Sequence, residues 1–338
     1  MEGEKTGKKS NHEGQRGENQ ILSTIIIPNY NGIDYIENCL NSLQEEPARI
    51  ILVDNGSTDG SREVAEEKFP KVQVIALQKN EGFCAAVNRG IRESKTTYVI
   101  LLNNDTVVRP GFVRALEEPL QKNERIFSGS AQMINMKSPE LIDDAGDYYC
   151  ALGWAFTVGK DKERRAYQKE RFIFAACGGA SIYRSRVMQQ IGMLDENHFA
   201  YLEDIDLGYR ARIAGYQNLY LPAAQVYHAG SASSGSRHNA FKVDLTARNS
   251  VYLVYKNMPL LQMLLNLPFL LAGYFIKMLF FMRKGLGGVY VRGLLKGCRL
   301  CLSAEGRVNK VHFQVKNLPA YGRIQWELWR NIWLRICY

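Results

Sequence analysis

The sequence lacks three features that would each place it in a distinct class. It has no apolar segment near its N-terminus, so no secretory signal is predicted. Its seven cysteines follow no disulfide or zinc-ligand spacing; the only close pair is Cys298 and Cys301, and we expect reduced thiols of a cytosolic protein. It has no internal repeat, and a hydrophobic content of 46% excludes a chain that is disordered throughout.

Excess charge of one sign is also absent from most of the chain. The formal net charge is +9, but residues 283–338 hold eleven Lys or Arg against Glu305 and Glu327, while residues 1–282 hold 32 basic and 32 acidic side chains. The basic character is therefore local and suits a surface that meets phosphate groups. The basic tail follows a long apolar segment and no nucleic-acid module is recognisable, so we expect an anionic membrane surface as partner and no nucleic acid.

The chain divides into four parts by composition. Residues 1–20 are polar and Gly-rich, which predicts a disordered tail. In residues 21–127, short β-branched runs alternate with helical stretches, which predicts an α/β fold with a mostly parallel sheet whose strands are buried on both faces. Residues 128–256 alternate less regularly and contain a helix after Tyr201; residues 257–338 are apolar and then basic.

The apolar stretch at residues 258–282 is long enough to span a bilayer. Pro268 interrupts it, and its polar residues fall on one side of a helix at about 100° per residue. This polar stripe consists of Gln262, Asn266, Gly273 and Lys277. A broken amphipathic region followed by basic residues predicts attachment in the plane of the membrane, and the alternative is a helix packed in the protein core.

Polar residues follow the first two predicted strands, where ligands of such sheets bind. Pro28 and Tyr30 end the first strand, and Asp54 ends the second. A carboxylate there can accept a hydrogen bond from a base or a ribose, and a tyrosine ring can stack on the base. The alternative for Asp54 is that it caps the turn that follows.

Two further strand ends carry similar signals. After the third strand come Asn80 and Gly82, and Gly82 permits close approach to the backbone, for a ligand or for packing alone. After the fourth strand come Asn104 and Asp105. The Asp105 carboxylate can hold a divalent cation, Mg²⁺ or Mn²⁺, that bridges two phosphates.

The second half of the chain adds three candidate segments. Gly178 and Gly179 form a small-residue turn that lets a sugar approach the backbone, or serves the fold alone. Glu203 and Asp204 open a helix, where capping explains acidic residues equally well. His228 ends a short apolar run, and a lone histidine there is either packing or a metal ligand.

These segments, taken in order, resemble a family 2 glycosyltransferase with a GT-A fold over roughly residues 22–250, and within that family the bacterial rhamnosyltransferase-like branch. The resemblance implies a nucleotide-sugar-binding half at 21–127, an acceptor-binding half at 128–256 and a membrane-associating region at 257–338. It implies that the nucleotide pocket is lined by the strand-end residues Pro28, Tyr30, Asp54, Asn80, Gly82 and Asn104.

The resemblance also assigns the chemistry. Asp105 corresponds to the metal-binding end of the family's Asp-x-Asp motif, and Asn103 replaces its first aspartate, which removes one negative charge. His228 corresponds to a second metal ligand. Gly178 and Gly179 lie beside the donor sugar and the acceptor. Asp204 corresponds to the catalytic base, with Glu203 as its rival.

The expected function is inverting transfer of a sugar, rhamnose or similar, from a dTDP or UDP sugar to a hydroxyl of a lipid-linked or cell-surface glycan. The acceptor is a glycan or a polyprenyl-linked glycan, and the expected location is peripheral, on the cytoplasmic face of the cell membrane. Two alternatives stay open. One is a nucleotidyltransferase, and the other is a non-catalytic sugar-nucleotide-binding scaffold of a polysaccharide assembly complex.

Overall fold

The computed structural model describes residues 21–230 and 239–337, so the tail expected at residues 1–20 lies outside the described part of the chain. The strands are β1 (Ser23–Asn29), β2 (Ala48–Asp54), β3 (Gln73–Ala76), β4 (Tyr98–Leu102), β5 (Thr106–Val108), β6 (Ile126–Asn135), β7 (Ile142–Asp144), β8 (Asp147–Cys150), β9 (Trp154–Thr157), β10 (Arg171–Ile173), β11 (Ala180–Arg184) and β12 (Gln217–His228).

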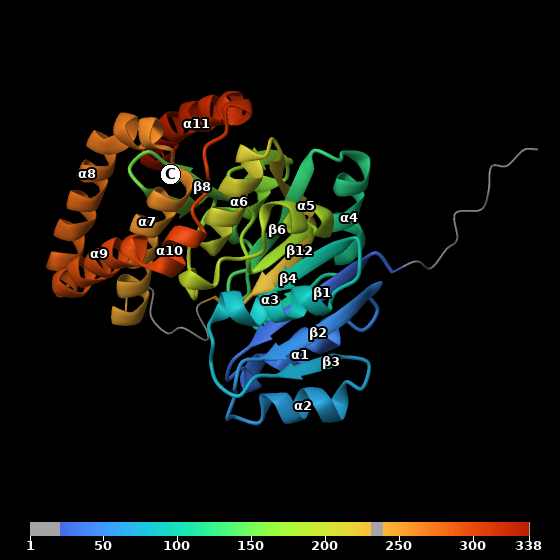
Figure 1. Cartoon of the computed structure of the whole chain (residues 1–338). Coiled ribbons are helices and arrows are strands. Elements are labelled where there is room, and N and C mark those ends of the chain that lie inside the picture. The colour runs from blue at the N-terminus through green and yellow to red at the C-terminus, as the bar shows by residue number, and fades with distance from the viewer. Residues whose placement is uncertain (1–20, 231–238, 338) are drawn as a thin grey trace, which may run out of the picture.

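Helices connect the strands and then make up the C-terminal part of the chain (Figure 1). They are α1 (Ile33–Ser42), α2 (Ser61–Lys68), α3 (Phe83–Glu93), α4 (Phe112–Lys122), α5 (Ser185–Ile191), α6 (Glu203–Ile213), α7 (Ala240–Asn257), α8 (Leu260–Arg283), α9 (Gly287–Leu302), α10 (Ala304–Val308) and α11 (Leu318–Cys337).

The central sheet is mostly parallel, as predicted. Its main path runs β10-β12-β6-β11-β4-β1-β2-β3, and β5 and β7 pair with β12 and β6 at its side. The contacts β4-β1, β1-β2 and β2-β3 are parallel, and so is β6-β12, whereas β11 runs antiparallel between β4 and β6. The carboxyl ends of β1 to β4 therefore meet at one edge, where the candidate residues follow.

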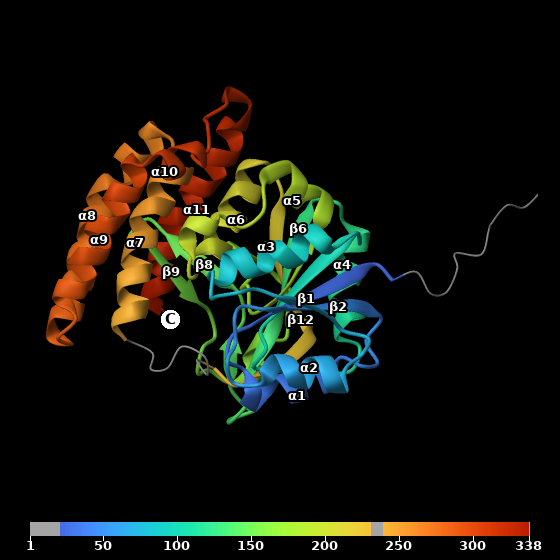
Figure 2. The same cartoon turned by 60° about the horizontal axis from the view of Figure 1, so that its bottom comes forward.

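Both faces of the sheet are covered by helices, which explains the β-branched composition of its central strands. Ile25 and Ile27 of β1 pack toward α1, α2 and α4, whereas Ile26 between them packs toward α3, α5 and α6. Figure 2 shows α3 on one side of the sheet and α1 and α2 on the other. The prediction of burial on both faces is wrong for β3, which is the edge strand and is partly exposed along its length.

The C-terminal helices form a separate layer beside the sheet (Figures 1 and 2). α7 packs along α9, α8 packs on α9, and α11 packs on β8 and α6. α7 therefore lies with this layer, although the C-terminal region was predicted to start at residue 257, where α7 ends.

The predicted break at Pro268 is wrong, because α8 is one continuous helix from Leu260 to Arg283 with Pro268 inside it. The polar stripe holds both halves of α8 on the protein. Gln262 accepts a hydrogen bond from the Tyr209 hydroxyl (2.8 Å), and Asn266 exchanges hydrogen bonds with Gln325 (2.8 Å). A Cβ on Gly273 would lie 2.1 Å from the Leu152 carbonyl oxygen, so only glycine allows this contact.

The apolar side of α8 consequently faces outward. Leu260, Leu261 and Leu271 are each more than 60% exposed, and only 22% of the most apolar window of the helix is buried. A core helix would show the opposite pattern, with its apolar side inward. The helix is long and apolar enough to cross a membrane by length and composition.

Candidate active site

The ends of β1 and β2 are tied together by a buried polar network. Asp54 is 2% exposed and accepts hydrogen bonds from the Asn29 side chain (3.1 Å) and the Ser57 backbone N–H (3.1 Å). Asp54 thus caps the turn after β2, which was the alternative given for it above. Its contact with a nucleotide stays a prediction. Tyr30, directly after β1, is 41% exposed and free to meet a flat ring.

The segment after β3 is shaped by two contacts. Asn80 Oδ1 accepts hydrogen bonds from the Asn55 side chain (3.1 Å) and from the Gly82 backbone N–H (2.9 Å). Gly82 has φ 93°, and a Cβ there would lie 2.5 Å from the Phe199 ring. Glycine is therefore required by backbone conformation and by packing on Phe199.

Asn104 supports the end of β1. Its side chain is 6% exposed and donates a hydrogen bond of 2.7 Å to Asn29 Oδ1. This contact positions the loop that carries the next residue, Asp105. The expectation that Asn104 itself touches the nucleotide stays a prediction.

Asp105 and His228, which are 123 positions apart in the sequence, are neighbours in the structure. β5 pairs antiparallel with the end of β12, so that Thr106 lies opposite His228. Asp105 Oδ1 lies 3.2 Å from His228 Nε2, and both side chains are nearly buried. A second carboxylate, Asp143 at β7, accepts from His228 Nδ1 at 2.7 Å and pairs with Lys160.

The electrostatics of this group follow from its two carboxylates. Burial disfavours the charged imidazolium, but the hydrogen bonds to Asp105 and Asp143 outweigh burial and raise the pKa of His228 to about 9. Burial likewise opposes the charge of Asp143, but His228 and Lys160 outweigh it and lower the pKa of Asp143 to about 2. The protonated His228 ring thus lies between two carboxylates. A cation can replace the proton on Nε2, beside Asp105.

The donor set fits a divalent cation. Asp105 supplies a carboxylate oxygen, and His228 supplies Nε2 while its Nδ1 is held by Asp143. A carboxylate behind a ligating histidine is the arrangement that fixes the ring of metal-bound histidines. Sequence reasoning did not find Asp143, although the acidic run at Asp143 and Asp144 was visible.

Glu203 and Asp204 open α6 after Leu202, whose backbone is left-handed (φ 68°). Asp204 Oδ1 accepts a hydrogen bond from the Ile205 N–H (2.7 Å) inside the first turn, whereas the N-cap residue Leu202 makes no side-chain capping hydrogen bond. Glu203 is 7% exposed, and its Oε2 has no hydrogen-bond partner among the described residues. Burial, reinforced by the charge of Asp204, raises the pKa of Glu203 to about 8.

Gly178 and Gly179 lie close to these groups. A Cβ on Gly178 would be 4.0 Å from a Glu203 carboxylate oxygen, and a Cβ on Gly179 would be 3.1 Å from the Asn103 side chain. The Gly179 carbonyl also accepts a hydrogen bond from the Asn103 N–H (2.9 Å). The small-residue turn therefore joins the β4 end to the start of α6.

A buried acidic cluster behind Asp204 was not predicted. Ligand atoms of Asp144, Asp147 and Cys177 lie within 4.8 Å of one another. Burial, with the charges of Asp144 and Asp204, raises the pKa of Asp147 well above its ordinary value, and Asp147 is hydrogen-bonded to Asp204. A hydrogen bond between two carboxyl groups needs one proton, which the raised pKa keeps on Asp147, so Asp204 is the acceptor and carries the negative charge of the pair.

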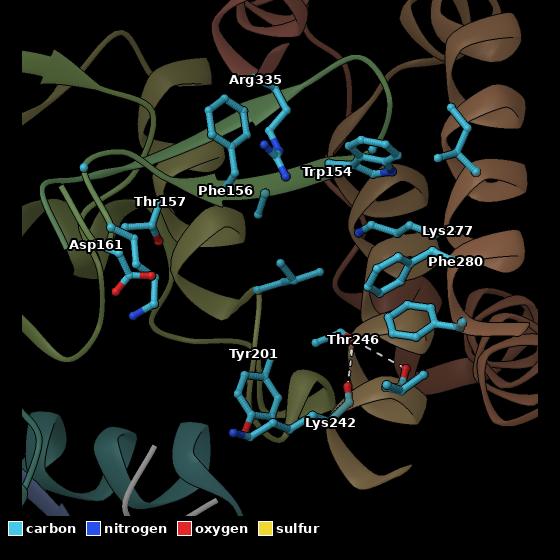
Figure 3. A pocket seen from close by; sticks show the side chains of 18 of the residues that line it. Trp154, Phe156, Thr157, Asp161, Tyr201, Lys242, Thr246, Lys277, Phe280 and Arg335 are labelled. Atoms are coloured by element: carbon cyan, nitrogen blue, oxygen red, sulfur yellow. Dashed lines mark hydrogen bonds between the residues drawn. The ribbon is translucent and has the colours of Figure 1, made fainter. Parts of the chain in front are cut away.

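A large cavity lies between the α/β domain and the C-terminal helices. It has a volume of about 1060 Å³, and Asn103, Asp105 and His228 line it together with residues of β9, α8 and α11. Figure 3 shows side chains from these elements pointing into the same space. Tyr201 and Leu202 also line it, which places the start of α6 beside the cavity.

The family model described as glycosyl transferase family 2 matches residues 24–192. An N-acetylglucosaminyl-diphospho-decaprenol L-rhamnosyltransferase of Mycobacterium tuberculosis is 29% identical over 241 residues, covering 62% of this chain and 77% of that protein.

Two solved structures share the fold. One is GalNAc-T7 with UDP, GalNAc and Mn²⁺, with a TM-score of 0.57 and 18% identity over 71% of this chain and 48% of the other. The second is residues 1–349 of TarS from S. aureus in complex with UDP-GlcNAc, with a TM-score of 0.50 and 17% identity over 71% of this chain and 68% of the other.

Proposed function

Because this chain belongs to glycosyl transferase family 2 and has the GT-A fold, we propose that it is an inverting transferase that moves rhamnose or a similar sugar from a dTDP or UDP sugar to a lipid-linked glycan. The observation that carries the proposal is the group of Asp105, His228 and Asp143 beside a cavity large enough for a sugar nucleotide. The lipid-linked acceptor follows from the name of the mycobacterial relative.

Asp204 is the proposed base. It accepts the proton of the acceptor hydroxyl, and that oxygen attacks the anomeric carbon as the nucleoside diphosphate departs from the opposite face. Asp147 supports this role because its hydrogen bond orients the Asp204 carboxylate. Burial raises the pKa of both carboxyl groups. Backbone hydrogen bonds from Ile205 and Gly178 favour the charged form of Asp204, whereas the pKa of Glu203 rises to about 8 and keeps it protonated near neutral pH, so Glu203 is less suited as the base.

Asp105 and His228 are the proposed holders of a divalent cation, Mg²⁺ or Mn²⁺. Such a cation would neutralise negative charge on the departing diphosphate. With such a cation bound, Asp143 would keep the proton on His228 Nδ1, and Nε2 would give up its proton and offer its lone pair beside Asp105. We place Pro28, Tyr30, Asp54, Asn80, Gly82 and Asn104 at the nucleotide, and Gly178 and Gly179 at the donor sugar and acceptor.

The proposed location is peripheral, on the cytoplasmic face of the cell membrane. The support is the outward apolar side of α8, together with exposed Trp326 and Trp333 on α11 and the basic residues between these helices. Aromatic and basic side chains next to an apolar surface suit the interface of an anionic membrane.

The test is a thermal-shift panel of nucleoside diphosphate sugars with and without Mn²⁺, on the wild type, Asp105→Asn and Asp161→Asn. Asp161 is an exposed aspartate that lines the same cavity and serves as the matched control. We expect one diphosphate sugar to raise the midpoint in a Mn²⁺-dependent manner in the wild type and in Asp161→Asn, and not in Asp105→Asn. Binding of that sugar without any turnover would favour the scaffold alternative, and the absence of any shift would refute sugar-nucleotide binding.

A further inference from the structure

Two cationic side chains enter the cavity from α8 and α11. Lys277 comes from α8 and Arg335 from α11, and both point into the same space (Figure 3). The Lys277 ammonium lies 5.6 Å from the centre of the Trp154 ring, and the Arg335 guanidinium carbon lies 5.8 Å from the centre of the Phe156 ring. Both aromatic rings belong to β9, which lines the same cavity.

Neither cation has a carboxylate partner within the described parts of the chain. Burial, together with the charge of Arg335, lowers the pKa of Lys277 to about 8. Elsewhere the chain pairs its enclosed cations, as with Lys256 between Asp195 and Asp206. Two positive groups held close together without a counter-charge favour a ligand that carries more than one negative charge.

The apolar side chains next to Lys277 indicate that this ligand also carries an apolar chain. On the same helix, Ile276 and Phe280 line the cavity and are 48% and 42% exposed, so they continue into the outward apolar side of α8. Charge inside the cavity and apolar surface at its rim suit an amphiphile, with its anionic group inward and its chain along the helix. A free nucleotide has no apolar chain that could contact this rim.

We propose that Lys277 and Arg335 bind the diphosphate of a prenyl-diphosphate-linked acceptor, whose prenyl chain leaves the cavity past Ile276 and Phe280. This inference rests on the proposed function and names the place at which its acceptor is held. Trp154 and Phe156 pack beside the same diphosphate and its first sugar, because flat aromatic rings suit sugar faces. The diphosphate of the donor belongs at Asp105 and His228 instead, so the cavity holds two diphosphates at two sets of residues.

The first experiment measures binding without catalysis. Isothermal titration calorimetry in neutral detergent compares farnesyl diphosphate with UDP in the presence of Mn²⁺. The variants are Lys277→Gln and Arg335→Gln, with Arg283→Gln and Arg330→Gln as matched controls on the same two helices but outside the cavity. Lys277→Met, which keeps the side-chain volume, replaces Lys277→Gln if the latter does not fold.

We expect each cavity variant to weaken farnesyl diphosphate binding about tenfold, as fits the loss of one charged hydrogen-bond donor, and to leave UDP binding within about twofold. The controls should bind both ligands as the wild type does. Unchanged farnesyl diphosphate binding in both cavity variants would overturn the inference. Weakened UDP binding would overturn it as well, because the two cations would then serve the donor.

The second experiment measures transfer to N-acetylglucosamine linked through a diphosphate to an undecyl chain. In the cavity variants we expect the acceptor KM to rise about tenfold, with kcat and the donor KM within about twofold. An unchanged acceptor KM would contradict the inference. Failure of the wild type to transfer from any donor would refute the proposed function instead, and the calorimetry would still decide the binding site.

Discussion

Replacing Glu203 with glutamine tests the electrostatics at the start of α6. Glu203 is 7% exposed, and burial and the charge of Asp204 raise its pKa from 4.5 to about 8. The folded protein therefore keeps this carboxyl protonated up to about pH 8, whereas the unfolded chain ionises it above about pH 4.5. Glutamine has nearly the same shape as the protonated acid and does not titrate.

The sign of the effect follows from proton binding. Between about pH 4.5 and pH 8 the unfolded wild type holds fewer protons at this position than the folded wild type, so the contribution of Glu203 to the free energy of unfolding falls as pH rises. The contribution is full below pH 4.5 and has been lost above pH 8. The largest slope for one group is about 1.4 kcal/mol per pH unit, and Glu203→Gln removes it.

The assay is urea unfolding at pH 5, 6, 7, 8 and 9 for the wild type, Glu203→Gln and Glu67→Gln, an exposed control on α2. We expect the stability of Glu203→Gln relative to the wild type to increase from pH 5 to pH 8 and to level off above, and the control to show no such trend. A pH-independent difference for Glu203→Gln would refute the reasoning. Retained transfer by this variant would in addition exclude Glu203 as the base.

Three further predictions concern the base, the metal and the membrane. Asp204→Asn should lower kcat for transfer about 10²- to 10⁴-fold with the donor KM within about threefold, measured by product formation, and full activity would remove Asp204 from its role. Because the pKa of His228 is raised to about 9, Mg²⁺ must displace its proton, and calorimetry in the presence of UDP should show affinity that increases from pH 7 to pH 9 and loses this slope in His228→Ala. Placing aspartate at both Leu264 and Leu271 on the exposed side of α8 should weaken sedimentation with anionic vesicles about tenfold or more, while an unchanged affinity would show that α8 does not touch the membrane.

The first half of the fold could be predicted from the sequence, because the local pattern of apolar and polar residues determines its strands. β1, β2 and β4 were predicted from β-branched runs, and their ends from the polar residues that follow them, because a buried parallel strand needs both. The edge position of β3 could not be predicted, since its composition resembles that of the buried strands and only the absence of a further neighbour exposes it.

The candidate site was predictable to the extent that its residues belong to motifs. Asp105 and His228 were named through the family resemblance, and the structure places them 3.2 Å apart. Asp143 was missed because it lies 85 positions from His228, and only the pairing of β7 with β6 brings it there. Asp147 was missed for the same reason, since its contact with Asp204 depends on how β8 packs against α6.

The orientation of α8 could not be predicted from the sequence. Periodicity located the polar stripe on one side of the helix but not what that side faces. The structure shows that Gln262 and Asn266 pair with α6 and α11, which turns the leucines outward. Membrane attachment through this side stays a prediction until vesicle binding is measured.

The most direct test of the central claim is the anomeric configuration of the product formed from the sugar nucleotide that the thermal-shift panel identifies. The reaction contains that donor, Mn²⁺ and the undecyl-diphosphate acceptor, and the configuration is read by NMR from the one-bond carbon–hydrogen coupling of the anomeric carbon. Direct displacement with Asp204 as base predicts a glycoside whose configuration is opposite to that of the donor. A product with the donor's configuration would contradict the mechanism.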